Sequence, residues 1–365
     1  MGVGGFAEAK VMKVLYKFPE TTNAYGSFVV DGNGLTYGTG TVGGASGYGT
    51  VFRFDPRTKN LVTLYSFLGG ADGANPVPGM VLSAGGTLYG ATTAGGAWGG
   101  GTVFAVDIKS GTEKVLHSFG SGKDGMSPQY GPIFGADGKL YGTTPVGGAS
   151  GYGAFYRVNQ NTGAEEVVFN PATANNGGPN ALTLGSSGLL YGTSFGNADV
   201  QNAFGTIFAF DPTTKAETVL YSFAGNQAPA AIHPVWGVVL GKGGVIFGTG
   251  RGVPFEFDPS TGTVTELPGL SGGITNTGRL LIDASGNIYG TQELYSYGSD
   301  PESGFVYVYN PASQTPTTLY QFKGRILGQV PCGIVFGKDG NLYGATLTSG
   351  NEKHPGYGTI FSVTP

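Results

Sequence analysis

The sequence predicts an all-β protein that folds as a single domain over residues 1–365, a seven-bladed β-propeller of four-stranded antiparallel blades. Three observations support this fold. A short segment such as LTYGT or LYGTT recurs seven times at intervals of 42 to 56 residues, which is typical of repeat architectures. Runs of β-branched and aromatic residues alternate with Gly, Asp and Asn turns, and no stretch has helical periodicity. Seven units built only from short strands favour a propeller.

The recurring segment, named here the aromatic-Gly motif, predicts the second strand of every blade. Glycine makes up 70 of 365 residues without a Gly-X-Y period, which excludes collagen. We expect the motif aromatic to pack between neighbouring blades, and the following glycine to let adjacent backbone approach closely. The seven aromatic residues are Tyr37, Tyr89, Tyr141, Tyr191, Phe247, Tyr289 and Tyr343.

The second repeat shows the four strands that each blade is expected to contain. Apolar or alternating segments lie at 80–82, 87–92, 102–106 and 114–119, and turn residues separate them. Asp-Gly pairs such as Asp137-Gly138 are expected to form turns. No D-x-D-x-D-G run suggests a calcium loop.

The two ends of the chain predict how the ring closes. Residues 358–363 have the pattern of a third strand with no fourth after it, and residues 11–18 have the pattern of a fourth strand. We expect them to pair in one blade, because this pairing removes free sheet edges and fixes both termini.

Four segments of the second repeat carry a family resemblance: 72–76 (DGANP), 88–92 (LYGAT), 95–96 (GG) and 101–104 (GTVF). On these residues the units resemble the GloVer-type Gly-rich tandem repeats, over nearly the whole chain. Repeats 4 to 6 depart from the pattern because their loops lack the double glycine. The resemblance implies a propeller and often an extracellular setting, and it implies no catalytic residue.

Composition restricts the partners. Charged residues are 12% of the chain, the net charge is −4 and no basic stripe is present, so a nucleic-acid partner is not expected. No apolar run is long enough to span a membrane. The single Cys332 and three scattered His predict no metal site, and no phosphate loop or dinucleotide fingerprint predicts a cofactor. Oligomeric state stays open. We expect a cytosolic protein if Met1 is the native start, and a secreted one if a signal peptide has been removed.

Propeller ligands bind most often at one end of the central channel, so we sought residues that break the repeat there. Arg279 lies ten residues before its motif aromatic, and a buried arginine needs a carboxylate, carbonyls or an anionic ligand. Every other blade has a small residue at that position: Ser27, Gly79, Gly131, Ala181, Gly237 and Gly333.

The candidate catalytic residues are Arg279, to stabilise negative charge, and three side chains that could move a proton: His233, Tyr295 and Tyr297. The candidate binding residues are aromatic or polar side chains of the loops that face the same end of the channel. They are Trp98, Trp236, Arg251, Glu293, Tyr130, Tyr152 and His354.

These residues favour a cofactor-independent enzyme of the lyase or cyclase type that acts on a sugar or aromatic small molecule at one mouth of the channel. Two alternatives remain. One is a carbohydrate-binding or protein-interaction propeller without catalysis. The other is a glycoside hydrolase that uses the carboxylates of the sixth blade, Glu293, Asp300 and Glu302. An enzyme should have one asymmetric site, whereas a multivalent binder should repeat its pocket.

Overall fold

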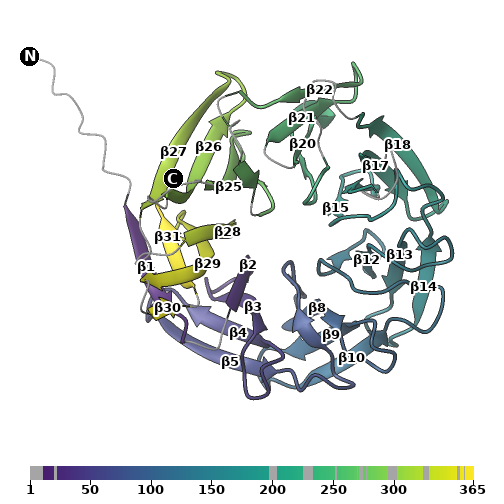
Figure 1. The fold of residues 1–365 in the computed structure, drawn as a ribbon, viewed down its shortest axis with the longest axis horizontal. Helices are drawn as coiled ribbons and strands as arrows, with labels where there is room; N and C mark the ends of the chain where they lie inside the picture. The colour runs from purple at the N-terminus through teal and green to yellow at the C-terminus, as the bar shows by residue number, and fades with distance from the viewer. Residues whose placement is uncertain are drawn as a thin grey trace, which may run out of the picture.

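Seven antiparallel sheets stand as blades around a central channel (Figure 1). The structure is a computed structural model that describes residues 11–19, 23–196, 204–224, 233–250, 253–268, 270, 274–276, 278–294, 302–323, 329–351, 354–356 and 358–365. Among these residues the regular structure is strand, apart from one 3-10 turn, η1 (Lys242–Gly244). The predicted fold class is therefore confirmed.

The first four blades follow the chain from the channel outwards, and in blade 2 two short inner strands, β6 and β7, both pair with β8. Blade 1 contains β2 (Asn23–Val30), β3 (Thr36–Val42), β4 (Thr50–Asp55) and β5 (Asn60–Ser66). Blade 2 contains β6 (Ala74–Pro76), β7 (Val81–Leu82), β8 (Thr87–Ala94), β9 (Thr102–Asp107) and β10 (Glu113–Ser118). Blade 3 contains β11 (Ile133–Phe134), β12 (Leu140–Thr144), β13 (Ala154–Val158) and β14 (Glu165–Phe169). Blade 4 contains β15 (Thr183–Leu184), β16 (Leu190–Ser194), β17 (Thr206–Asp211) and β18 (Ala216–Ser222).

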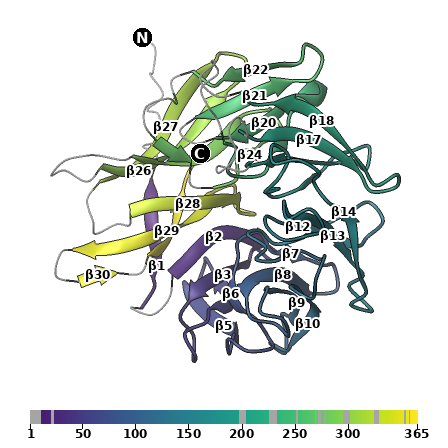
Figure 2. The same cartoon turned by 45° about the vertical axis from the view of Figure 1, so that its right-hand side comes forward.

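Blades 5 and 6 keep the same order. Blade 5 contains β19 (Val239–Leu240), β20 (Ile246–Thr249), β21 (Pro254–Asp258) and β22 (Thr263–Glu266). Blade 6 contains β23 (Ile274–Asn276), β24 (Leu281–Ile282), β25 (Ile288–Leu294), β26 (Glu302–Asn310) and β27 (Thr315–Lys323). Figure 2 shows the ring obliquely, with the blades twisted in the manner of propeller sheets.

Blade 7 joins the two ends of the chain, as predicted. It contains β28 (Gln329–Phe336), β29 (Leu342–Asn351), β30 (His354–Gly356), β31 (Thr359–Val363) and, as its outer strand, β1 (Met12–Lys17). β1 runs antiparallel to β31, with Met12 opposite Val363 and Lys17 opposite Thr359. In Figure 1 β1 lies at the rim of the ring beside β31. This pairing covers the edge that β31 would otherwise expose.

The glycine of each motif makes room for an aromatic ring on the next strand. Gly90 pairs with Phe104 across β8 and β9, and a Cβ added to Gly90 would lie 2.4 Å from Cζ of that ring. Gly142 and Gly290 stand in the same relation to Tyr156 and Tyr307. We predicted that backbone would approach the motif glycines. At Gly90, Gly142 and Gly290 the nearest atoms belong to side chains, whereas at Gly344 an added Cβ would also lie 2.8 Å from the Gly333 carbonyl oxygen.

Each of two motif tyrosines, Tyr141 and Tyr343, bonds through its hydroxyl to the turn between the first and second strands of its blade. The Tyr141 hydroxyl donates to Asp137 Oδ2 at 3.1 Å, and that of Tyr343 donates to Asp339 Oδ2 at 2.7 Å. The ring of Tyr141 packs in a core cluster that includes Phe208 of the following blade. The motif aromatic therefore packs between blades, as predicted, and the turn aspartates accept hydrogen bonds. Within the described residues, no helix is long and apolar enough to cross a membrane.

Candidate functional site

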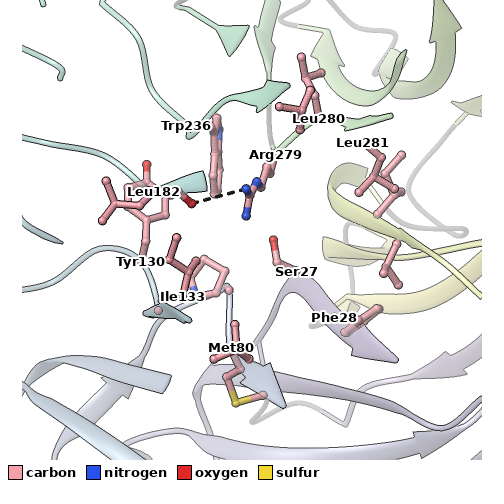
Figure 3. A pocket seen from close by; sticks show the side chains of 18 of the residues that line it. Ser27, Phe28, Met80, Tyr130, Ile133, Leu182, Trp236, Arg279, Leu280 and Leu281 are labelled. Carbon is pink, nitrogen blue, oxygen red and sulfur yellow. Dashed lines mark hydrogen bonds between the residues drawn. The ribbon is translucent and has the colours of Figure 1, made fainter. Parts of the chain in front are cut away.

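A cavity of about 350 Å³ lies in the central channel, where the inner strands converge (Figure 3). All seven blades contribute to its wall. Aliphatic side chains such as Leu182 and Ile334 supply much of this wall, and the polar groups are few. The labelled residues that line it are Ser27, Phe28, Met80, Tyr130, Ile133, Leu182, Trp236, Arg279, Leu280 and Leu281. Small-molecule sites have this character: a mostly apolar wall with a few polar groups.

The repeat position singled out from the sequence forms part of this wall. Ser27, Gly79, Gly131, Ala181 and Arg279 all line the cavity. Four of these five residues are small, so they leave the space that the long Arg279 side chain enters. The sequence prediction that Arg279 projects into the channel agrees with its position in Figure 3.

Arg279 is held by two acceptors from blade 4. Its Nη2 donates to Thr183 Oγ1 at 2.6 Å and to the Leu182 carbonyl at 3.5 Å. The Thr183 hydroxyl in turn donates to the Val238 carbonyl. Within the described part of the chain, Nε and Nη1 of Arg279 have no acceptor, and no carboxylate lies within 4.0 Å of the guanidinium.

Arg279 has an unusual electrostatic environment. Part of its side chain is accessible because it faces the cavity, while the ring of blades shields it from bulk water. This desolvation lowers the pKa of Arg279. A guanidinium nevertheless keeps its proton at physiological pH, so the cavity contains a positive charge without a carboxylate partner among the described residues.

Sequence analysis missed Thr183, although a signal for it exists. Thr183 lies eight residues before its motif aromatic and is the only polar residue at that position in the seven repeats. The other blades carry Val29, Val81, Ile133, Val239, Leu281 and Val335. The two departures from the repeat pattern, Thr183 and Arg279, thus contact each other in space.

Tyr130 and Trp236 form an aromatic corner of the cavity. Their ring centroids are 5.5 Å apart with an interplanar angle of 65°, an edge-to-face contact. The Tyr130 hydroxyl donates to the Val235 carbonyl, and burial raises the pKa of Tyr130. Tyr130 therefore stays protonated at neutral pH and is poorly suited to act as a base. Both residues were predicted to bind ligand, and both line the cavity.

His233 lies at a blade seam and is not part of the cavity wall. Its ring stacks on Phe195, with centroids 4.8 Å apart, and it also contacts Phe204. Nδ1 lies 2.9 Å from the Phe195 carbonyl, which assigns the proton to Nδ1 if the ring is neutral. These contacts join the blade 4 loop to blade 5.

Three further candidates stand apart from the cavity. Trp98, in the loop between β8 and β9, is 65% exposed. Tyr152 is half-buried in the corresponding loop of blade 3, where its carbonyl accepts a hydrogen bond from the Gly178 N–H. Glu293 lies on β25 and is half-buried, and desolvation raises its pKa. None of the three belongs to the cavity wall.

The remaining candidates are not placed by the structure. Tyr295, Tyr297 and Arg251 lie outside the described residues. His354 is the first residue of β30, and its side chain lies outside the described part. Over the ranges that are described, no three His, Cys, Asp or Glu side chains form a group that could hold a metal ion.

The comparisons with known proteins concern the repeat and the fold. A family model of the Gloeobacter/Verrucomicrobia repeat matches residues 23–251, more than half of the chain. Curated protein sequences provide no match.

Solved structures similar to this fold include a sensor domain and two lyases. The extracellular domain of a hybrid two-component system from B. thetaiotaomicron is 10% identical, with a TM-score of 0.65. That match covers 97% of this chain but only 39% of the sensor domain. An oligogalacturonate lyase in complex with manganese is 15% identical, with a TM-score of 0.61 and coverage of 97% of this chain and 92% of the lyase. The oligogalacturonate lyase of Vibrio parahaemolyticus is 12% identical, with a TM-score of 0.61 and coverage of 98% and 97%. At these identities the likeness demonstrates the fold alone.

Proposed function

The chain belongs to the Gloeobacter/Verrucomicrobia repeat family, and we propose that its propeller binds a small carboxylate-bearing molecule in the central cavity. One observation carries this proposal. Arg279 places a guanidinium in the cavity, and no carboxylate of the described residues lies within ion-pair distance of it.

The Arg279 guanidinium lies in the cavity without a carboxylate partner among the described residues. Removing a guanidinium from water is costly unless hydrogen bonds or an opposite charge replace its hydration. Thr183 and Leu182 satisfy Nη2 only, so Nε and Nη1 are available to a ligand. A carboxylate can accept two parallel N–H bonds from one edge of a guanidinium, which makes it a well-matched partner.

The rest of the wall indicates the body of the ligand. Trp236 and Tyr130 offer aromatic surface next to Arg279, and the Ser27 hydroxyl points toward the same space (Figure 3). A cyclic acid, either a sugar acid or an aromatic acid, would place its ring against the aromatic corner and its carboxylate at Arg279. The likeness in fold to two oligogalacturonate lyases supports the sugar-acid class, since the substrate in their name is an oligomer of a sugar acid.

A lyase reaction on such an acid is the second candidate function. An arginine bound to the carboxylate would stabilise the negative charge that develops when a base removes the neighbouring C–H proton. The described part of the cavity wall offers Tyr130 as a titratable side chain besides Arg279, and its raised pKa makes it a weak base candidate. The geometry therefore supports binding more strongly than catalysis.

Titration calorimetry with matched ligand pairs tests the proposal. Each acid is compared with its primary amide, for example galacturonic acid with galacturonamide, and benzoic acid with benzamide. We expect the wild-type protein to prefer the acids, and Arg279→Gln to weaken acid binding about 10- to 100-fold, the loss expected for a charge-assisted hydrogen-bond pair. Arg57→Gln removes an exposed arginine outside the cavity wall and should leave binding unchanged. Equal affinity of the wild-type protein for acids and amides would contradict the proposal.

A further inference from the structure

The seams between blades contain a buried polar cluster that is separate from the cavity. It recurs with a spacing of 52 residues. Ser121, Asp124 and Glu165 of one seam correspond to Thr173, Asn176 and Glu217 of the next. One member differs in chemistry, because an aspartate in the first seam stands where the second has an asparagine.

In the asparagine seam both polar atoms of the Asn176 side chain have a partner. Asn176 Oδ1 accepts from the Thr173 N–H at 3.0 Å and from its hydroxyl at 2.8 Å. Asn176 Nδ2 donates to Glu217 Oε2 at 2.7 Å. The side chains of Asn176 and Glu217 therefore lie within hydrogen-bond distance of each other.

The aspartate seam repeats half of this pattern. Asp124 Oδ2 accepts from the Ser121 hydroxyl at 3.1 Å and lies 3.1 Å from His117 Nε2. Asp124 Oδ1, which takes the place of the asparagine amide, is buried, and no N–H or O–H group of the described residues donates a hydrogen bond to it. Glu165 Oε1 is also buried without a partner among the described residues, as is Glu217 Oε1 in the asparagine seam, so Asp124 Oδ1 is the atom that distinguishes the two seams. Asp124 is only 5% exposed, so water cannot readily satisfy it.

We propose that Asp124 and Glu165 share one proton at neutral pH, so that a carboxyl–carboxylate hydrogen bond replaces the amide hydrogen bond of the asparagine seam. Two neighbouring carboxylates that are shielded from water cannot both be charged at low cost. A proton on Glu165 supplies the donor that Asp124 Oδ1 lacks, and the repeat counterparts of the two residues, Asn176 and Glu217, are in contact at 2.7 Å. When pH rises and the proton leaves, two negative charges face each other and the seam is destabilised. The cluster is thus a pH-sensitive clasp between blades 2 and 3.

The electrostatics of the seam agree with this assignment. Desolvation first, and then the charges of Asp124 and Glu166, raise the pKa of Glu165 from 4.5 to about 7. Desolvation also lowers the pKa of His117, which favours a neutral ring beside Asp124. The other groups that face the pair are the Tyr156 phenol and Glu166.

Tyr156 and Glu166 do not change the number of protons that the Asp124–Glu165 pair holds. Burial raises the pKa of Tyr156, which stays a neutral phenol. Glu166 is ion-paired with Arg157 and Lys215.

The seam between blades 1 and 2 also contains an aspartate and a glutamate at these repeat positions. Glu113 and Asp72 occupy the corresponding positions, and Glu113 Oε1 is also buried without a partner among the described residues. Desolvation, followed by the charge of Asp72, raises the pKa of Glu113 to about 7. In the asparagine seam burial also raises the pKa of Glu217, but the hydrogen bond from Asn176 opposes this rise and no neighbouring carboxylate adds to it.

The raised pKa fixes the sign of the pH dependence. A carboxyl group with a higher pKa in the folded than in the unfolded state contributes stability that is fully present below pH 4.5. This contribution is lost as pH rises through about 7. For one such group the unfolding constant should increase about 70-fold between roughly pH 5 and 8.

Urea unfolding of the full chain at these two pH values tests the clasp. Glu165→Gln cannot ionise, so the pH-dependent rise in its unfolding constant should be about 70-fold smaller than that of wild type. Asp124→Asn recreates the asparagine seam, so it should also reduce the rise, by lowering the pH at which Glu165 ionises. The matched control is Glu217→Gln in the asparagine seam, whose effect should be smaller than that of Glu165→Gln.

Two results would overturn the inference. If Glu165→Gln keeps the wild-type pH dependence, Glu165 does not hold a proton at neutral pH. If Asp124→Asn keeps it, the proton is not shared with Asp124. Should a variant fail to fold, infrared spectroscopy of the wild-type protein decides instead: a buried protonated carboxyl band near neutral pH that disappears on alkalinisation supports the clasp, and its absence contradicts it.

Discussion

Tyr307 provides a direct test of how the motif glycines organise each blade. Its ring fills the space above Gly290, and the side chain is fully buried. Its hydroxyl has no hydrogen-bond partner among the described residues. Five other blades have phenylalanine at this position: Phe52, Phe104, Phe208, Phe255 and Phe361. We therefore predict that Tyr307→Phe stabilises the protein.

The magnitude follows from the cost of the buried hydroxyl. An unsatisfied buried polar group costs about 1–3 kcal/mol, and Tyr307→Phe removes it while keeping the ring. With an unfolding entropy of about 2.1 cal/mol/K per residue, a 365-residue domain should gain about 1–4 °C in Tm. Urea unfolding at constant pH measures the free energy directly.

Tyr37→Phe is the matched control, because its hydroxyl has a partner. Tyr37 donates to Asp31 Oδ2 at 3.1 Å, so the same chemical change should lower stability by about 0.5–1.5 kcal/mol. The reasoning is refuted if Tyr307→Phe destabilises the protein as much as Tyr37→Phe does. That outcome would mean that a buried water or another group satisfies the Tyr307 hydroxyl.

Two further substitutions test the blade and the cavity. Gly90→Ala should destabilise the protein by about 1–3 kcal/mol in urea unfolding, because its Cβ would meet Phe104, and Phe104→Leu in the same chain should recover part of the loss. An unchanged midpoint for Gly90→Ala would contradict the close contact. Thr183→Val removes the 2.6 Å acceptor of Arg279 and should weaken acid binding about 2- to 10-fold in calorimetry, whereas Thr183→Ser should bind as wild type does. Equal binding by the valine and serine variants would show that Thr183 does not position the guanidinium.

The fold could be predicted because its signals are local and repeated. The motif fixes the second strand of each blade, and short turns fix the neighbours of that strand. Closure through residues 11–18 and 358–363 followed from counting strands at the two ends. The role of the motif glycine was less accessible, since Gly90 faces Phe104 only once the register between β8 and β9 is known.

The site was only partly predictable, for a geometric reason. Arg279 was found because it breaks a repeat position that lines the channel in several blades, and Tyr130 and Trp236 were found as aromatic residues of the loops at the channel mouth. His233 departs from the repeat as clearly as Arg279 does, yet its contacts with Phe195 and Phe204 place it in a seam. A departure from the pattern identifies an unusual residue, but only the packing of its loop determines which way the side chain points.

The most direct test of the anion site is a crystal structure of the protein soaked with a cyclic carboxylic acid, chosen from the calorimetric panel. We predict one bound molecule in the central cavity, with its carboxylate at Nε and Nη1 of Arg279 and its ring against Trp236. Ligand density on the outer loops, or at equivalent positions in several blades, with the cavity beside Arg279 vacant, would contradict the account.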